Sequence, residues 1–275
     1  MSTLKQAQTQ SRYDDLFARL KQEKRHALIP FTLLGWPTPQ RCLESVDAFV
    51  AGGASALELG LAFSDPVADG PLIQQAGRTV LEAGFDVDQT LGLLKQIRQK
   101  YPHIPISLLV YYNLVLVRGI DRFCRDITEA GADGLLIADL PVEGIAEIKP
   151  ALDQHGLQLT SIISTRTSAE RLPKIAAQSG GFLYAVSRLG ITGVEERYDQ
   201  SLGHLLAQAR QCSDLPVCVG FGISKREHVE TMIRLGADGV IVGSAVMAKI
   251  QELGPEDSIE PIQRYLQTLS TPIIP

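Results

Sequence analysis

Glu58 is the residue whose type and setting most clearly indicate chemistry. It lies in Leu57-Glu58-Leu59, inside a short apolar run that is typical of a strand buried on both faces. A buried carboxylate is costly unless it is paired or used. One role is a structural ion pair in the protein interior. The other, which we favour, is a general acid–base group whose pKa is raised by loss of water.

The loop after that strand carries two more carboxylates. Asp65 stands in Asp65-Pro66, and Asp69 stands in Asp69-Gly70-Pro71. Both are ordinary turn sequences, so turn formation alone is one explanation for them. The length of the loop and its place beside Glu58 favour a functional role, because two carboxylates in different environments can divide acid and base work.

Three glycine-rich segments suggest a site for an anion. They are 190–193, 220–224 and 243–244, and the last two follow expected strands and open helices. Backbone amides at helix starts bind phosphate well, although glycines that merely let a strand pass into a helix are the simpler alternative. The segments contain no lysine or arginine, which suits a phosphate monoester held mainly by backbone dipoles. Neither GxxxxGK[ST] nor GxGxxG occurs, so a nucleotide loop is not supported.

The elements that position these residues repeat along the chain. At 53–60, 131–139 and 236–243 a helix ends in Gly-Ala and continues into a buried strand, and 180–186 is a looser copy. Such units imply parallel strands. Collecting all similar runs predicts eight strands, at 27–34, 56–60, 106–110, 134–138, 158–163, 182–186, 217–220 and 239–242.

Eight such units predict a (β/α)8 TIM barrel, with a doubly wound sheet as the alternative. We expect one domain over 1–275, flexible at 1–10, with an extra helix at 11–22 that plugs the bottom of the barrel. Long loops are expected after the second strand, at 62–72, and after the sixth, at 187–198. Capping boxes at Thr167-x-x-Glu170 and Ser224-x-x-Glu227 predict two helix starts.

Composition excludes several classes of protein. The chain is 45% hydrophobic with a net charge of −5, which argues against disorder and against a nucleic-acid partner. The apolar stretch 104–117 is too short to span a membrane, and 1–10 lacks the plan of a signal peptide, so we expect a cytoplasmic protein. Four scattered cysteines and five isolated histidines predict neither disulfides nor a metal site.

The motifs resemble the tryptophan synthase alpha chain family. Segment 57–71 is similar to the family signature, and the other matches follow in family order at 29–31, 35–37, 108–113, 138–143, 187–193, 220–224 and 243–245. The resemblance covers 13–269. It implies a retro-aldol cleavage of indole-3-glycerol phosphate to indole and glyceraldehyde 3-phosphate.

The resemblance also implies roles for individual residues. Glu58 would protonate indole C3 and take the proton of the glycerol hydroxyl, and Asp69 would hold the indole N–H. The remaining roles are packing around the indole by Phe31, Leu109 and Leu136, a supporting tyrosine at Tyr184, phosphate binding by Gly193, Gly222, Gly243 and Ser244, and a mobile lid carrying Arg188 and Thr192.

The family works as an α2β2 complex, and this implies a partner for the chain. Pyridoxal phosphate would belong to the β subunit, to which indole passes through a tunnel, and no cofactor or metal is expected in this chain. Asp65 and Pro66 lie on the loop that faces the partner in the family.

The sequence departs from the family pattern at three positions. Ala62 replaces a usual proline, Leu189 replaces a small polar residue, and Trp36 stands where the family commonly has another polar or aromatic residue. These leave open a duplicated paralogue that is weakly active or serves a specialised indole pathway, and that acts mainly through a β-subunit partner. A sugar-phosphate isomerase is the rival from another enzyme class, whereas the absence of a strand-end lysine disfavours a Schiff-base aldolase.

Overall fold

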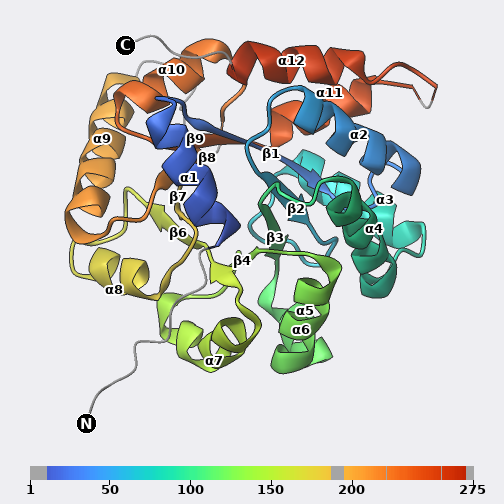
Figure 1. Ribbon diagram of the computed structural model, residues 1–275, viewed down its shortest axis with the longest axis horizontal. Helices are drawn as coiled ribbons and strands as arrows, with labels where there is room; N and C mark the ends of the chain where they lie inside the picture. The colour runs from blue at the N-terminus through green and yellow to red at the C-terminus, as the bar shows by residue number, and fades with distance from the viewer. Residues whose placement is uncertain (1–10, 187–194, 221, 255, 271–275) are drawn as a thin grey trace.

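The computed structural model describes residues 11–186, 195–220, 222–254 and 256–270, and its centre is one parallel sheet. Within these residues nine strands pair in the order β5-β4-β3-β2-β1-β9-β8-β7-β6 (Figure 1). The strands are β1 (Ala27–Leu33), β2 (Leu57–Gly60), β3 (Ile106–Val110), β4 (Gly134–Ile137), β5 (Gln158–Leu159), β6 (Ser161–Ser164), β7 (Leu183–Val186), β8 (Val217–Gly220) and β9 (Gly239–Val242).

The two edges of this sheet are consecutive in the chain, so the sheet forms a nearly closed barrel. Thr160 separates β5 from β6, and its amide donates to the Leu135 carbonyl of β4 at 3.0 Å. The next residue, Ser161, already pairs with Leu183 of β7. The strand predicted at 158–163 is therefore divided, because it passes from one neighbour to the other at Thr160. The predicted barrel is confirmed with nine strands rather than eight, and the doubly wound alternative is wrong.

Helices surround the barrel, as Figure 1 shows. They are α1 (Arg12–Gln22), α2 (Pro39–Ala51), α3 (Pro71–Glu82), α4 (Val87–Lys100), α5 (Tyr112–Arg118), α6 (Ile120–Ala130), η1 (Val142–Gly144), α7 (Ile145–His155), α8 (Arg171–Gln178), α9 (Glu195–Cys212), α10 (Arg226–Arg234), α11 (Ser244–Glu252) and α12 (Glu260–Ser270). The long loop predicted after β2 is present and ends where α3 begins. The segment 1–10 lies outside the described residues, and so does most of the loop predicted at 187–198 after β7. The predicted end of that loop is wrong, because 195–198 already belong to α9.

Both predicted capping boxes are wrong. The helix α8 begins at Arg171 rather than after Thr167, whose hydroxyl instead accepts the Ser164 amide at 3.0 Å and closes a turn after β6. The helix α10 begins at Arg226, because the Ser224 amide donates to Nδ1 of His228 at 3.2 Å. In both places a local turn satisfies the groups that a capping box would have used.

The helix α1 closes the bottom of the barrel, as predicted. In Figure 1 it crosses in front of the strands, inside the ring of helices. Its buried side chains are Tyr13, Leu16 and Leu20. They form a cluster with residues of the barrel and its amino-terminal rim, namely Ala27, Ile29, Ala56, Phe182, Cys218 and Ile241. A larger apolar core packs between the strands and the outer helices, which leaves the carboxyl ends of the strands for a site.

Candidate active site

A cavity of about 560 Å³ opens among the carboxyl ends of the strands. It is lined by alternate residues of the strands, because every second side chain of a strand points into the barrel. The residues predicted for the site from sequence that line it are Phe31, Glu58, Asp69, Leu109, Leu136, Tyr184, Gly222, Gly243 and Ser244. The barrel therefore brings together residues that span most of the chain.

Glu58 lies at the inner end of this cavity, between Phe31 of β1 and Ser107 of β3 in the strand pairing. Its side chain is buried, with the residue only 2% exposed, and Oε1 has no hydrogen-bond partner among the described residues. Burial, reinforced by the charge of Asp69, raises the pKa of Glu58 to about 8. The carboxyl group can therefore carry a proton at neutral pH.

Asp69 reaches the same cavity from the loop after β2. Burial raises its pKa to about 6, and a hydrogen bond with the Tyr111 hydroxyl lowers it in part. The same hydroxyl accepts the Ala68 amide at 3.0 Å, and the Tyr111 ring stacks on Phe63 with centroids 5.1 Å apart. Tyr111 thus holds the loop in place, a role that the sequence did not reveal. The available signals were its position immediately after a strand, at the rim where barrel sites are built, and its place in the segment 108–113 that resembles the family.

Much of the cavity wall is apolar and suits a flat aromatic group. It includes Phe31, Leu109, Leu136, Ile162 and Ile241, contributed by five different strands. Tyr184 completes this wall: burial and the nearby charge of Glu58 raise its pKa well above the usual value, so the phenol stays protonated. A planar ring placed here would lie within reach of both carboxyl groups.

Backbone amides also line the cavity, next to the apolar side chains. Gly243 and Ser244 stand at the start of α11, and Gly222 follows β8. A side chain on Gly243 would meet the Phe31 ring at 3.5 Å, so these amides adjoin the apolar wall. Of the described residues that line the cavity none is lysine or arginine. An anion would therefore be held here by amides and by the dipole of α11.

Two other predicted residues that the structure describes, Asp65 and Pro66, do not line this cavity. Asp65 is exposed and accepts a hydrogen bond from the Ser64 hydroxyl, and Pro66 is half-buried on the same loop. Arg188, Leu189, Thr192 and Gly193 lie outside the described residues. Of the two other departures from the family pattern, Trp36 is buried in the core and Ala62 packs against it.

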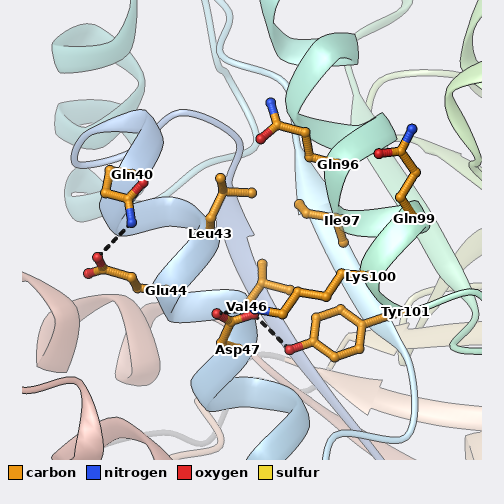
Figure 2. Close-up of a pocket in the computed structure, with 10 residues that line it drawn as sticks. All are labelled: Gln40, Leu43, Glu44, Val46, Asp47, Gln96, Ile97, Gln99, Lys100 and Tyr101. Atoms are coloured by element: carbon orange, nitrogen blue, oxygen red, sulfur yellow. Dashed lines mark hydrogen bonds and ion pairs between the residues drawn. The ribbon is translucent and has the colours of Figure 1, made fainter.

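A second cavity of about 520 Å³ lies outside the barrel, between α2 and α4 (Figure 2). Its carboxylate Asp47 is already used, because it accepts from Lys100 Nζ and from the Tyr101 hydroxyl, both at 2.7 Å. Within the described part of the chain no cluster of side chains could hold a metal ion, and no helix is both long and apolar enough to cross a membrane. The four cysteines are all unpaired. The chemistry therefore centres on the first cavity.

Comparisons with known proteins agree with the resemblance. The sequence profile described as "Tryptophan synthase alpha chain" matches residues 17–271. The tryptophan synthase alpha chain of Aeromonas hydrophila is 43% identical over 259 residues, which are 94% of this chain and 97% of that protein. The crystal structure of tryptophan synthase subunit alpha from Legionella pneumophila covers 95% of this chain and 98% of its own, with a TM-score of 0.87 and 33% identity. A chain of the tryptophan synthase complex from Pyrococcus furiosus covers 89% of this chain and 98% of its own, with a TM-score of 0.80 and 34% identity.

Proposed function

The chain belongs to the tryptophan synthase alpha chain family, and from this premise we propose that it cleaves indole-3-glycerol phosphate to indole and glyceraldehyde 3-phosphate. It is a lyase of tryptophan biosynthesis, and the bond that breaks joins indole C3 to the glycerol carbon. The observation that carries the proposal is the pair of Glu58 and Asp69, two carboxyl groups with different pKa values on one cavity.

Glu58 serves as acid and then as base. In its protonated form it donates to indole C3, which converts the ring into an indolenine with positive charge on nitrogen. The resulting carboxylate takes the proton of the hydroxyl on the adjacent glycerol carbon. That carbon becomes an aldehyde as its bond to C3 breaks, and the electron pair of the bond returns to the ring. A pKa of about 8 suits this exchange, because proton transfer in either direction is then inexpensive near neutral pH.

Asp69 stabilises the charged intermediate. With a pKa of about 6 it is mostly ionised at neutral pH, so it accepts the indole N–H as the nitrogen becomes positive. Phe31, Leu109 and Leu136 pack against the two faces of the ring. We place the phosphate at the amides of Gly222, Gly243 and Ser244. The family resemblance adds Gly193 to the phosphate site and assigns Thr192 and Arg188 to the lid. An apolar wall of this size favours an aromatic substrate over the small sugar phosphate of an isomerase.

The partner in this proposal is a tryptophan synthase β subunit, in an α2β2 complex to which the loop at Asp65 and Pro66 is directed. The similar chain from Pyrococcus furiosus belongs to a tryptophan synthase complex, which supports such an assembly. We assign no cofactor to this chain and attribute pyridoxal phosphate to the partner. We also assign the chain to the cytoplasm and treat residues 1–275 as one domain.

Indole release tests the proposal. The purified chain is incubated with indole-3-glycerol phosphate, with and without a β subunit, and indole is measured over time. We expect release that the β subunit accelerates and that Glu58→Gln abolishes. Release at the parent rate by Glu58→Gln would disprove the mechanism. No release under any condition would point to the non-catalytic paralogue, which nothing in the cavity otherwise favours.

A further inference from the structure

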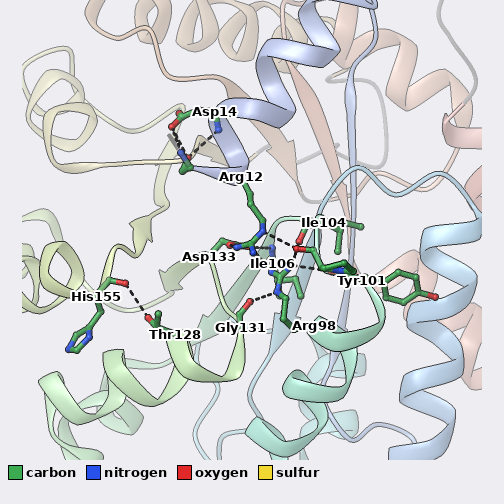
Figure 3. Close-up of polar contacts among 12 residues, drawn as sticks. Arg12, Asp14, Arg98, Tyr101, Ile104, Ile106, Thr128, Gly131, Asp133 and His155 are labelled. Carbon is green, nitrogen blue, oxygen red and sulfur yellow. Dashed lines mark hydrogen bonds and ion pairs between the residues drawn. The ribbon is translucent and has the colours of Figure 1, made fainter. Parts of the chain in front are cut away.

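Three charged side chains, Arg12, Arg98 and Asp133, join the N-terminal helix to the bottom of the barrel, on the side away from the cavity (Figure 3). Asp133 Oδ1 accepts from Arg12 Nη1 at 2.5 Å. Its Oδ2 accepts from Arg98 Nη2 at 2.6 Å and from the Ile106 amide at 2.8 Å. The Asp133 side chain is only 7% exposed, so these are charge-assisted hydrogen bonds with little competition from water. We call this group the Arg12–Arg98–Asp133 clamp.

The same two guanidinium groups also hold the segment that leads into β3. Arg98 donates to the carbonyls of Tyr101 at 3.0 Å and Ile104 at 2.7 Å, and Arg12 Nε donates to the Pro102 carbonyl at 3.1 Å. A further bond joins Arg98 to the Gly131 carbonyl at the end of α6, as Figure 3 shows. The clamp therefore fixes α1 relative to the starts of β3 and β4.

Each anchoring point of the clamp is followed in sequence by a residue that faces the barrel interior. Tyr13 follows Arg12, Gly134 follows Asp133, and Ser107 follows the residue whose amide donates to Asp133. A side chain on Gly134 would lie 3.4 Å from Cε2 of Tyr13 and 3.6 Å from Oγ of Ser107, so the three positions meet. Ser107 is the strand neighbour of Glu58. One-residue steps thus connect the clamp to the wall beside the catalytic carboxyl group.

The electrostatics of Tyr13 show the same connection. Burial, and then the charges of Asp133 and Glu58, raise the pKa of Tyr13 well above its usual value. The titratable groups that face Glu58 are Asp69 from the loop after β2, Tyr184 from β7, Cys218 from β8 and Tyr13 from α1. Among the described residues, the titratable group that α1 presents to Glu58 is therefore the neutral phenol of Tyr13.

We propose that the Arg12–Arg98–Asp133 clamp is a positioning device for Glu58, which holds α1 across the bottom of the barrel and so keeps water from the space beneath the carboxyl group. The inference rests on the function proposed above. None of the three residues lines the cavity, so they are positioning residues and not catalytic ones. Loss of the clamp would let α1 move, admit water and reduce the desolvation that keeps Glu58 protonated.

Arg12→Met in the full-length chain, assayed with a β subunit, tests this inference. Arg12 is 45% exposed and methionine keeps much of its stem, so we expect the variant to fold. The alkaline fall of kcat/KM for indole release should begin at a pH about one unit lower than in the parent. The reason is that a carboxyl group in contact with water ionises at lower pH than a buried one. At pH 9, kcat/KM of Arg12→Met should therefore be lower than that of the parent by up to about tenfold. Amide hydrogen exchange in α1 should be faster.

Two further variants separate positioning from general damage. Arg19→Met changes an exposed arginine of the same helix and should leave both the pH profile and the exchange of α1 as in the parent. Arg12→Lys keeps the charge next to Asp133 and should restore most of the parent profile. If Arg12→Met does not fold, Arg12→Gln, which also removes that charge, replaces it in the comparison.

The outcomes distinguish the two proposals. If the parent with its β subunit releases no indole, the proposed function is wrong. If the parent is active and Arg12→Met speeds exchange in α1 without moving the pH profile, the clamp only stabilises the fold and the inference is wrong. A profile that moves equally in Arg19→Met would also contradict it, because the effect would then follow from loss of any positive charge on α1.

Discussion

The ring of Tyr184 fills the space in front of Gly220. A Cβ atom on Gly220 would lie 2.5 Å from Cζ and 2.7 Å from Cε1 of that ring, closer than packed atoms approach. Both residues point into the barrel from neighbouring strands, β7 and β8. Tyr184 is partly buried and packs against the apolar cluster at the bottom of the barrel, so it has little room to yield, and the absence of a side chain at Gly220 fixes where the phenol lies.

Overpacking a core costs about 1–3 kcal/mol, and here the added methyl group displaces the Tyr184 phenol. We therefore expect Gly220→Ala to lower kcat/KM for indole release by about 5- to 150-fold. Steady-state kinetics measure the loss. Gly92→Ala is the matched control, because a side chain on Gly92 of α4 would meet nothing within 4 Å. In a Tyr184→Ala background the same change at Gly220 should cost little more, and full additivity of the two losses would show that Gly220 does not act through Tyr184.

Glu58→Gln should remove activity and yet stabilise the fold at high pH. General acid–base catalysis contributes about 10²- to 10⁴-fold, so kcat should fall within or beyond that range. Glu58 has a higher pKa in the folded state, about 8, than in the unfolded state, about 4.5. Its contribution to the free energy of unfolding is therefore fully present below about pH 4.5 and is lost as the pH rises through about 8. Glutamine does not ionise, and the variant should therefore gain stability relative to the parent between pH 5 and pH 9. Urea unfolding at both pH values measures this, and an equal difference at the two would contradict it.

Asp69 and Glu58 together predict a bell-shaped pH profile for kcat/KM. Activity should rise as Asp69 ionises near pH 6 and fall as Glu58 ionises near pH 8. Asp69→Asn should remove the acid limb. It should also move the alkaline limb to lower pH, because the charge of Asp69 helps to raise the pKa of Glu58. The exposed Glu82, changed to Gln, is the control that should leave both limbs in place. An acid limb that persists in Asp69→Asn would assign it to another group.

Removing the Tyr111 hydroxyl should shift the acid limb of the same profile to higher pH. The hydrogen bond from Tyr111 lowers the pKa of Asp69, so Tyr111→Phe should raise that pKa. The stacking on Phe63 remains, so we expect the fold to survive. Tyr112→Phe is the control: its hydroxyl donates to Glu147 at 3.0 Å, and its loss should leave the profile unchanged. Identical profiles for the two variants would show that Tyr111 does not influence Asp69.

Features that depend on nearby residues could be predicted from the sequence. Gly53, Gly131 and Gly236 end helices before strands and have φ values of 95°, 104° and 103°, which only glycine adopts readily. Glu58 was identifiable because a carboxylate in a continuous apolar run is rare in a buried strand. The capping boxes show the limit of such reasoning, since Thr167 and Ser224 have the right spacing but are used in other turns.

Features that depend on distant contacts could not be predicted. Tyr111 reaches the loop at Ala68 across 43 positions, and Arg12 reaches Asp133 across 121. No local pattern specifies such pairs, because the closing of the barrel brings them together. Thr160 is similar: the break in its strand follows from pairing with β4 on one side and β7 on the other, which only the assembled sheet determines.

The start of α11 gives a test in which stability and substrate binding should change in opposite directions. Ser244 is the first residue of the helix and lines the cavity. Ser244→Asp places a negative charge at a helix N-terminus, which stabilises helices by about 0.3–1 kcal/mol. The same charge would repel the substrate phosphate, so KM for indole-3-glycerol phosphate should rise by about tenfold or more while the unfolding midpoint stays equal or increases. Ser244→Asn is similar in size and uncharged, and it should leave KM within a few fold of the parent. If the charged and uncharged variants have the same KM, the phosphate does not lie at the start of α11. Its site would then lie nearer to Gly222.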